Sequence, residues 1–115
     1  MEKMINYGID LGTTNSAIAK FVKGEVEVFK NPLETGKETL PSVVYYKKDK
    51  VVVGTNARTY FERDAENVFG TFKRKMGTTE SFKVKSINQS KTPIELSAEV
   101  LKELKGFVHS GESFD

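Results

Sequence analysis

Several residue types and patterns are absent from this chain, and each absence excludes a class of protein. The 115 residues contain no cysteine, which excludes a disulfide framework and a thiolate metal site. No apolar run approaches the roughly 18 residues of a membrane-spanning helix, and the first residues lack the apolar core of a signal peptide. We therefore expect a cytoplasmic protein without a membrane partner.

Neither sign of charge dominates the sequence. The 18 basic and 16 acidic residues are well mixed and leave a net charge of +2, so nucleic acid is not an expected partner. A hydrophobic content of 37% is ordinary for a globular chain. The length is enough for one small domain with a modest core, or for a piece of a larger one.

Common catalytic and phosphate-binding signatures are also missing. The nine glycines form neither G-x-x-x-x-G-K-[ST] nor G-x-G-x-x-G, and there is no kinase-type glycine loop. The single histidine, His109, lies in a polar C-terminal stretch, so nucleophile–histidine pairs and histidine-rich metal sites are not supported. We interpret His109 as a surface residue.

Alternating apolar residues separated by turn residues predict a chain rich in strands. The first three predicted strands form an antiparallel meander, with the first turn at Gly12–Asn15, and a later pair forms a hairpin across 47–50. Residues 55–63 are predicted as a short helix, whereas 69–77 fit no single element because glycines interrupt a helix there. The predicted strands are 4–10, 16–22, 26–29, 42–46, 51–53 and 82–87.

The last predicted element is the clearest helix. Thr92-Pro93-Ile94-Glu95 combines a capping threonine, a proline at the first helical position and a glutamate three residues after the cap. Apolar residues then recur at helical spacing, and we expect their face to pack in the core rather than bind a partner. These residues are Ile94, Ala98, Leu101, Leu104 and Val108, with Lys102, Glu103 and Lys105 expected outside.

Residues 9–16, IDLGTTNS, place a carboxylate at the end of a predicted strand, before a turn of small and polar residues. Asp10 is a hard oxygen ligand suited to a hydrated magnesium ion. Gly12 lets the backbone approach a phosphate, and successive N–H groups of such a turn form an anion-binding concavity. The hydroxyls of Thr13 and Thr14 can donate to phosphate oxygens. An ordinary hairpin uses the same residue types, so the residues alone leave both interpretations open.

The longer stretch YGIDLGTTNSAIA resembles the first phosphate loop of the heat-shock protein 70 chaperones of the DnaK type, members of the actin and sugar-kinase ATPase superfamily. This loop would also suit a glycerol kinase or an actin relative. Four later stretches resemble successive blocks of the chaperone domain in the same order, and they favour the chaperone. They are TLPSVVYY at 39–46, VVVGTNAR at 51–58, FKRKMG at 72–77 and IELSAEVLKELK at 94–105.

The resemblance implies an α/β fold, here an α+β fragment of an actin-like (ribonuclease H-like) ATPase lobe. Its parts are an antiparallel three-strand meander and a small sheet-and-helix subdomain. We expect 1–37 to form the first strands with the phosphate loop, and 38–115 to form the smaller subdomain of the same lobe. The second phosphate loop, the adenosine site and the peptide-binding domain are not in this sequence. The resemblance therefore implies an N-terminal fragment of a larger ATPase, which alone neither binds ATP tightly nor hydrolyses it.

Roles for individual residues also follow from the resemblance. Asp10 matches the aspartate that holds magnesium, largely through water, and Gly12–Asn15 match the loop around the β- and γ-phosphates of ATP or ADP. Thr13 matches a residue that assists at the γ-phosphate. Lys73 matches the lysine that reaches the γ-phosphate and the attacking water, where a positive charge stabilises the transition state. Without the matching block around it, Lys73 is interpreted as a solvated lysine.

For the whole protein, the resemblance implies an ATP hydrolase active in protein folding and the stress response. Its partners would be unfolded client polypeptides, a J-domain cochaperone and a nucleotide exchange factor. A metabolite kinase of the same superfamily and a nucleotide-independent interaction module remain as alternatives. The chain departs from the family at Asp64-Ala65, where Asn-Pro is frequent, and at Lys75, where an apolar residue is usual. The stretch between Gly77 and Thr92 is also shorter than in many relatives.

The family topology further predicts how the chain associates. It places the first strand, about 4–10, in the centre of a sheet, with its outer side paired to a strand that begins beyond Asp115. In this chain that edge would be open and would lack the usual protections of an edge strand. We therefore expect self-association, most simply as a two-fold dimer that pairs the first strands.

Overall fold

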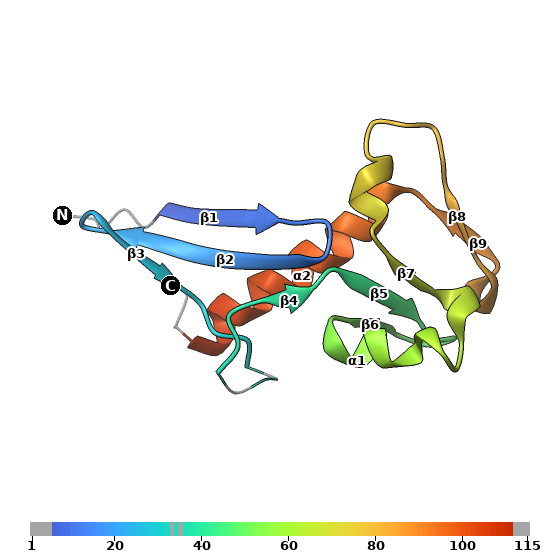
Figure 1. The fold of residues 1–115 in the computed structure, drawn as a ribbon, viewed down its shortest axis with the longest axis horizontal. Helices are drawn as coiled ribbons and strands as arrows, with labels where there is room; N and C mark the ends of the chain where they lie inside the picture. The colour runs from blue at the N-terminus through green and yellow to red at the C-terminus, as the bar shows by residue number, and fades with distance from the viewer. Residues whose placement is uncertain (1–5, 33, 35, 112–115) are drawn as a thin grey trace.

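The computed structural model describes residues 6–32, 34 and 36–111, and Figure 1 shows how their sheets and helices are arranged. Residues 4 and 5 of the first predicted strand and the side chain of His109 lie outside this description. In chain order the elements are β1 (Asn6–Leu11), β2 (Asn15–Val22), β3 (Glu25–Val28), β4 (Leu40–Pro41), β5 (Val43–Tyr46), β6 (Val51–Val53), α1 (Thr55–Arg58), η1 (Thr59–Phe61), η2 (Ala65–Asn67), β7 (Val68–Gly70), η3 (Phe72–Lys75), β8 (Phe82–Val84), η4 (Lys85–Ile87), β9 (Gln89–Lys91) and α2 (Pro93–Gly111), where η marks a 3₁₀ helix.

The first sheet is the predicted antiparallel meander of β1, β2 and β3. Its strands alternate because successive side chains of a strand point to opposite faces: Ser16 and Ile18 are buried, while Ala17 and Ala19 between them are less so. The short strand β4 adds to this sheet by pairing with the start of β2, where Asn15 lies opposite Pro41. The sequence did not predict β4 as a separate strand.

The second sheet contains the predicted hairpin β5–β6, to which β7 adds on the other side of β5. The strand β7 lies in the stretch for which the sequence pattern favoured no element. The predicted helix over 55–63 is an α-helix only over Thr55–Arg58 and continues as the 3₁₀ helix η1 to Phe61.

The predicted strand over 82–87 is correct only in its first half. Residues 82–84 form β8 and pair with β9, whereas Lys85–Ile87 form a 3₁₀ turn. Two hydrogen bonds to distant residues hold this turn: the Ser86 N–H donates to Asn67 Oδ1 at 2.8 Å, and the Ser86 hydroxyl donates to the Tyr46 carbonyl at 2.6 Å. These contacts replace the strand pairing that the alternation of residues predicted.

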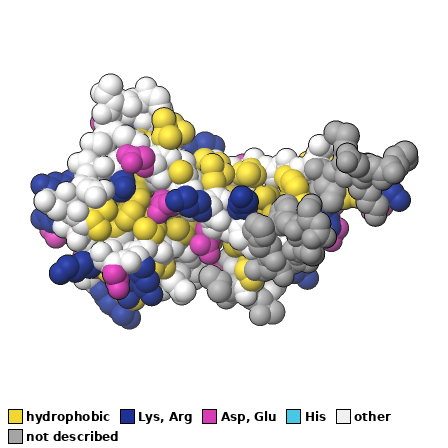
Figure 2. Space-filling model, turned by 180° about the vertical axis from the view of Figure 1, so that it is seen from behind, with side chains coloured by type: hydrophobic (Ala, Val, Ile, Leu, Met, Phe, Trp, Pro, Cys, Tyr) yellow, Lys and Arg dark blue, Asp and Glu magenta, His cyan; other side chains and the backbone are white. Residues whose placement is uncertain are grey.

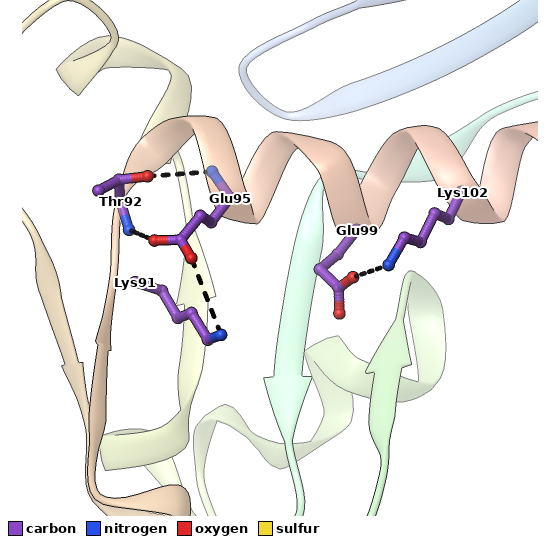
Figure 3. A network of polar contacts seen from close by, with 5 residues as sticks. All are labelled: Lys91, Thr92, Glu95, Glu99 and Lys102. Atoms are coloured by element: carbon purple, nitrogen blue, oxygen red, sulfur yellow. Dashed lines mark hydrogen bonds and ion pairs between the residues drawn. The ribbon is translucent and has the colours of Figure 1, made fainter.

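The N-terminus of α2 confirms the predicted capping box. The Thr92 N–H donates to Glu95 Oε1 at 3.0 Å, and the Glu95 N–H donates to Thr92 Oγ1 at 3.1 Å (Figure 3). The hydrogen bond from the Thr92 backbone is the main cause that lowers the pKa of the Glu95 carboxyl. Lys91 and Lys102 add ion pairs to the same helix, with Glu95 and Glu99 respectively.

The buried face of α2 is not the one predicted from the sequence. Ile94 is 66% exposed and Leu101 36% exposed, and Ala98 is also exposed, so only two of the five predicted core residues are buried. The helix carries a second apolar stripe, which shares Leu104 and Val108 with the predicted one but otherwise lies on an adjacent face. This second stripe packs against the sheets. Its fully buried residues are Leu96, Val100, Leu104, Phe107 and Val108.

One hydrophobic core joins the first sheet to the second through α2. It contains Ile18 and Phe29 from the N-terminal part together with Val44, Phe72 and the buried stripe of α2. Figure 1 shows α2 running diagonally behind the first sheet toward the second. On the face of the molecule shown in Figure 2, both acidic and basic side chains occur, with hydrophobic side chains between them. Among the described helices, none has the length and apolar character needed to cross a membrane.

Candidate functional site

The predicted phosphate loop is the turn between β1 and β2. Asp10 is exposed near the end of β1 and pairs in register with Ala17 of β2. Gly12 follows at a point where only glycine fits, because a Cβ atom there would collide with the carbonyl oxygen of Asn15. Both Thr13 and Thr14 lie on this tight turn. Thr13 is half-buried and Thr14 is exposed, so a ligand has room to approach the backbone of the turn.

Ser42, the residue after β4, fixes this turn through hydrogen bonds. The Ser42 hydroxyl donates to the Gly12 carbonyl at 2.9 Å, and the Ser42 N–H donates to the Thr14 carbonyl at 2.8 Å. A third hydrogen bond, of 2.8 Å, joins the hydroxyls of Ser42 and Ser16. Sequence reasoning treated Ser42 only as the start of a strand. The block TLPS, which places a serine directly after a strand-ending proline, was the one signal that could have singled it out.

Lys73 lies on the short helix η3, which the core holds in place. The neighbouring Phe72 is buried at 2% exposure, while Lys73 itself is exposed. The chain enters η3 through Thr71, whose left-handed φ of 53° turns the backbone sharply. After η3, the Ser97 hydroxyl of α2 donates to Met76 Sδ at 3.6 Å.

The helix α2 contacts both η3 and β2, the strand that follows the predicted phosphate loop. The structure thus attaches the loop and the Lys73 segment to one helix, although no hydrogen bond or ion pair joins Lys73 to Asp10–Asn15 in the described residues. The described residues also contain no cluster of three or more acidic, histidine or cysteine side chains that could hold a metal ion. A lone carboxylate fits magnesium, which keeps several waters and takes few protein ligands, usually together with substrate phosphates.

Two of the residues at which the chain departs from the family pattern, Asp64 and Lys75, have ordinary structural roles. Asp64 accepts hydrogen bonds from the Tyr45 hydroxyl at 2.9 Å and from Asn67 Nδ2 at 2.9 Å. Burial, with the adjacent Asp64, raises the pKa of Tyr45, whose ring also stacks on Tyr60 at 4.3 Å between centroids. Lys75 forms an exposed ion pair with Glu80 at 3.0 Å. In the described part of the chain, no hydrogen bond or ion pair joins either residue to the predicted phosphate loop.

A hollow of about 450 Å³ lies between the β5–β6 turn and the first half of α2. Tyr46 lines it, and burial together with Glu99 and Glu95 raises the pKa of its hydroxyl. The charged side chains around it, lysines and acidic residues alike, belong to the β5–β6 turn, to α2 and, in the case of Lys91, to the end of β9. None of the predicted site residues lines this hollow.

The sheets and the helix packed on them define a mixed α/β chain of the kind that makes up part of an actin-like ATPase lobe. The family model described as "Hsp70 protein" matches residues 6–112, and the chain belongs to the Hsp70 family. The fold class and the family predicted from the sequence are therefore confirmed.

Curated relatives support this assignment. The chain is 42% identical over 106 residues to the chaperone protein DnaK of Mycoplasma mobile, an alignment that covers 92% of this chain and 16% of the relative. It is 42% identical over 107 residues to DnaK of Ureaplasma urealyticum serovar 10, covering 93% and 17%, and 39% identical to DnaK of Mycoplasmopsis agalactiae over the same shares. The chain thus spans about a sixth of the length of the relatives that it matches.

Proposed function

We propose that this chain is the N-terminal part of the ATPase domain of a longer, ATP-dependent protein-folding chaperone of the Hsp70 type. The observation that carries the proposal is the turn after Asp10, where Gly12 admits no Cβ and Ser42 holds the backbone with hydrogen bonds to Gly12 and Thr14. A backbone fixed in this way can present N–H groups to a phosphate without having to order itself on binding. An ordinary hairpin turn requires no such support from a distant residue.

In this proposal each predicted site residue has a separate task. Asp10 holds magnesium through water, and Gly12–Asn15 surround the β- and γ-phosphates of ATP or ADP. Thr13 assists at the γ-phosphate. Lys73 supplies positive charge as negative charge spreads over the γ-phosphate oxygens. Bound magnesium neutralises phosphate charge in such a site.

The proposed division of the chain places the loop in 1–37 and Lys73 in 38–115, the smaller subdomain of the same lobe. The proposed partners of the whole protein are client polypeptides, a J-domain cochaperone and a nucleotide exchange factor. The chain by itself provides one wall of a nucleotide cleft, so we propose that it neither binds ATP tightly nor hydrolyses it alone.

A chimaeric DnaK tests the assignment. Residues 6–112 of this chain replace the matching segment of the Mycoplasma mobile relative, and single-turnover ATP hydrolysis is measured with and without Lys73→Ala. We expect the chimaera to hydrolyse ATP, and the substitution to slow hydrolysis by at least ~100-fold, about 3 kcal/mol, while ATP still binds. The matched control is Lys75→Ala, which removes another exposed lysine from the same short helix and should change the rate less than about twofold.

Two results would contradict the proposal. A Lys73→Ala chimaera that retains more than half of the unsubstituted rate removes Lys73 from the site. A chimaera that folds but binds no ATP contradicts the phosphate loop itself and favours an interaction module.

A further inference from the structure

Ser42 orients two peptide groups of the turn between β1 and β2. Its hydroxyl donates to the Gly12 carbonyl at 2.9 Å, and its N–H donates to the Thr14 carbonyl at 2.8 Å. In a trans peptide, the C=O of one residue and the N–H of the next point in opposite directions. The N–H groups of Thr13 and Asn15 therefore point away from Ser42. In the described part of the chain, no backbone carbonyl accepts a hydrogen bond from the Thr13 N–H.

Ser42 also lies at the start of a short path to Lys73. It directly precedes β5, whose first residue, Val43, lies opposite Gly70 of β7. Gly70 is followed by Thr71 and then by η3, the 3₁₀ helix that carries Lys73. Ser42 is 3% exposed and Val43 is 6% exposed, so both are fixed in packed surroundings. The path from the turn to Lys73 therefore runs through paired strands and not through a long loop.

Packing restricts movement along this path. A Cβ atom on Gly70 would lie 3.3 Å from Phe61 Cζ and 3.7 Å from Val43 Cγ2, so both side chains lie directly beside the Gly70 backbone. At the far end of the path, Phe72 anchors η3 in the core next to Lys73. Close-packed groups of this kind transmit a displacement instead of absorbing it. A shift of Ser42 relative to the turn would thus change the distance between the turn and Lys73.

We propose that Ser42 is a positioning residue for ATP hydrolysis, an inference that rests on the proposed function. Its two hydrogen bonds keep the N–H groups of the turn directed toward the nucleotide phosphates, and they fix the turn relative to Lys73. The N–H groups and the lysine charge then act together on the negative charge that develops at the γ-phosphate. In this role Ser42 acts through the turn, without contact to the nucleotide.

Ser16 offers a matched control, because the hydrogen bonds of Ser42 would also stabilise a turn that binds nothing. The Ser16 hydroxyl lies 2.8 Å from that of Ser42 and the residue is 1% exposed, so Ser16→Ala disturbs the same buried cluster. This substitution leaves both hydrogen bonds from Ser42 to the turn in place. A role confined to stability predicts similar hydrolysis rates for Ser16→Ala and Ser42→Ala, whereas a positioning role predicts different ones.

Single-turnover ATP hydrolysis by the chimaeric DnaK tests the proposal. The rates are measured at saturating ATP and at a temperature where each variant is folded, so that neither weaker binding nor unfolding limits them. We expect Ser42→Ala to slow hydrolysis by at least about tenfold, because a displacement of about 1 Å at a reacting group can cost about a hundredfold in rate. Ser16→Ala should hydrolyse ATP at a rate close to that of the unsubstituted chimaera.

A double-mutant cycle with Lys73→Ala gives a readout that a purely structural role would not change. If Ser42 places the turn relative to Lys73, its substitution should matter little once the lysine charge is gone, and should slow the Lys73→Ala chimaera by less than about threefold. Independent losses would multiply. In that case Ser42→Ala would slow the Lys73→Ala chimaera by the same factor as the unsubstituted one, and the proposal would be overturned.

The remaining results separate this role from the proposed function. If Lys73→Ala slows hydrolysis but Ser42→Ala and Ser16→Ala have equal rates, the positioning role is overturned and the proposed function stands. A folded chimaera that does not hydrolyse ATP contradicts both. If Ser42→Ala does not fold, Ser42→Cys takes its place, since a thiol has a similar shape but is a weaker donor. Ser42→Cys should then be slower than Ser16→Ala, and equal rates would again overturn the proposal.

Discussion

Replacing Ser42 with alanine is the most direct test of how the turn between β1 and β2, the predicted phosphate loop, is held. A serine hydroxyl has one proton, and that of Ser42 is donated to the Gly12 carbonyl, so the Ser16 hydroxyl donates to Ser42 Oγ. Ser42→Ala removes both hydrogen bonds. It leaves the Ser16 hydroxyl without a partner at 1% exposure, and the half-buried Gly12 carbonyl loses a donor.

An unsatisfied buried polar group costs about 1–3 kcal/mol, and a partly exposed one costs less because water can reach it. We therefore expect Ser42→Ala to lower the free energy of unfolding by about 2–3 kcal/mol. Urea unfolding followed by circular dichroism measures this change. The matched control is Ser97→Ala: Ser97 is as buried as Ser42, but its hydroxyl donates only to the sulfur of Met76, so the loss should stay below about 1 kcal/mol.

The double variant with Ser16→Ala separates the two contributions. When both serines are alanine, the unsatisfied hydroxyl of Ser16 is gone, so the double variant should be no less stable than Ser42→Ala alone. A loss below about 0.5 kcal/mol for Ser42→Ala, or one equal to that of Ser97→Ala, would refute the reasoning.

Four further predictions follow from single features. Gly12→Ala should cost about 1–3 kcal/mol in urea unfolding, because its Cβ collides with the Asn15 carbonyl; an unchanged midpoint would contradict the tight turn. Gly106→Ala should instead stabilise the chain by about 0.5–1 kcal/mol, since a Cβ in this part of α2 meets no other atom, and a lower Tm would argue against that space. The pKa of Glu95 is lowered in the fold, so its contribution is present at neutral pH and lost as pH falls below the ordinary value of 4.5; unfolding free energies of the unsubstituted chain and Glu95→Gln should converge in acid, and parallel curves would contradict this. Calorimetry with magnesium present should find no affinity of this chain for ATP tighter than about 1 mM, and micromolar binding would mean that one wall of the cleft suffices.

The features that the sequence predicted well are those with local causes. The capping box needs only Thr92 and Glu95 three residues apart, and both of its hydrogen bonds are present. The meander of the first sheet follows from strand alternation and short turns, and Gly24 occupies a positive φ of 80° in its second turn. In each case the interacting residues are neighbours in the chain, so spacing alone carries the information.

The features that it missed depend on distant partners. Two apolar stripes compete on α2, and only the positions of the sheets select the stripe with Leu96 over the one with Ile94. Ser42 contacts residues 26 and 30 positions away, and no local pattern marks such a pair. The roles of Asp10 and Lys73 remain predictions, because these roles concern a bound magnesium ion and the phosphates of a bound nucleotide.

The shared core has a consequence for the order in which the chain can fold during synthesis. The inner face of the first sheet contributes Ile18 and Phe29 to this core, and the residues that α2 contributes to it begin at Leu96. A ribosome adds roughly 5–20 residues each second, so α2 begins to be synthesised about 3–14 s after the meander is complete. A small isolated sheet with one uncovered apolar face is marginally stable in water. Until α2 has been made, β1, β2 and β3 lack this part of the core and are prone to aggregate.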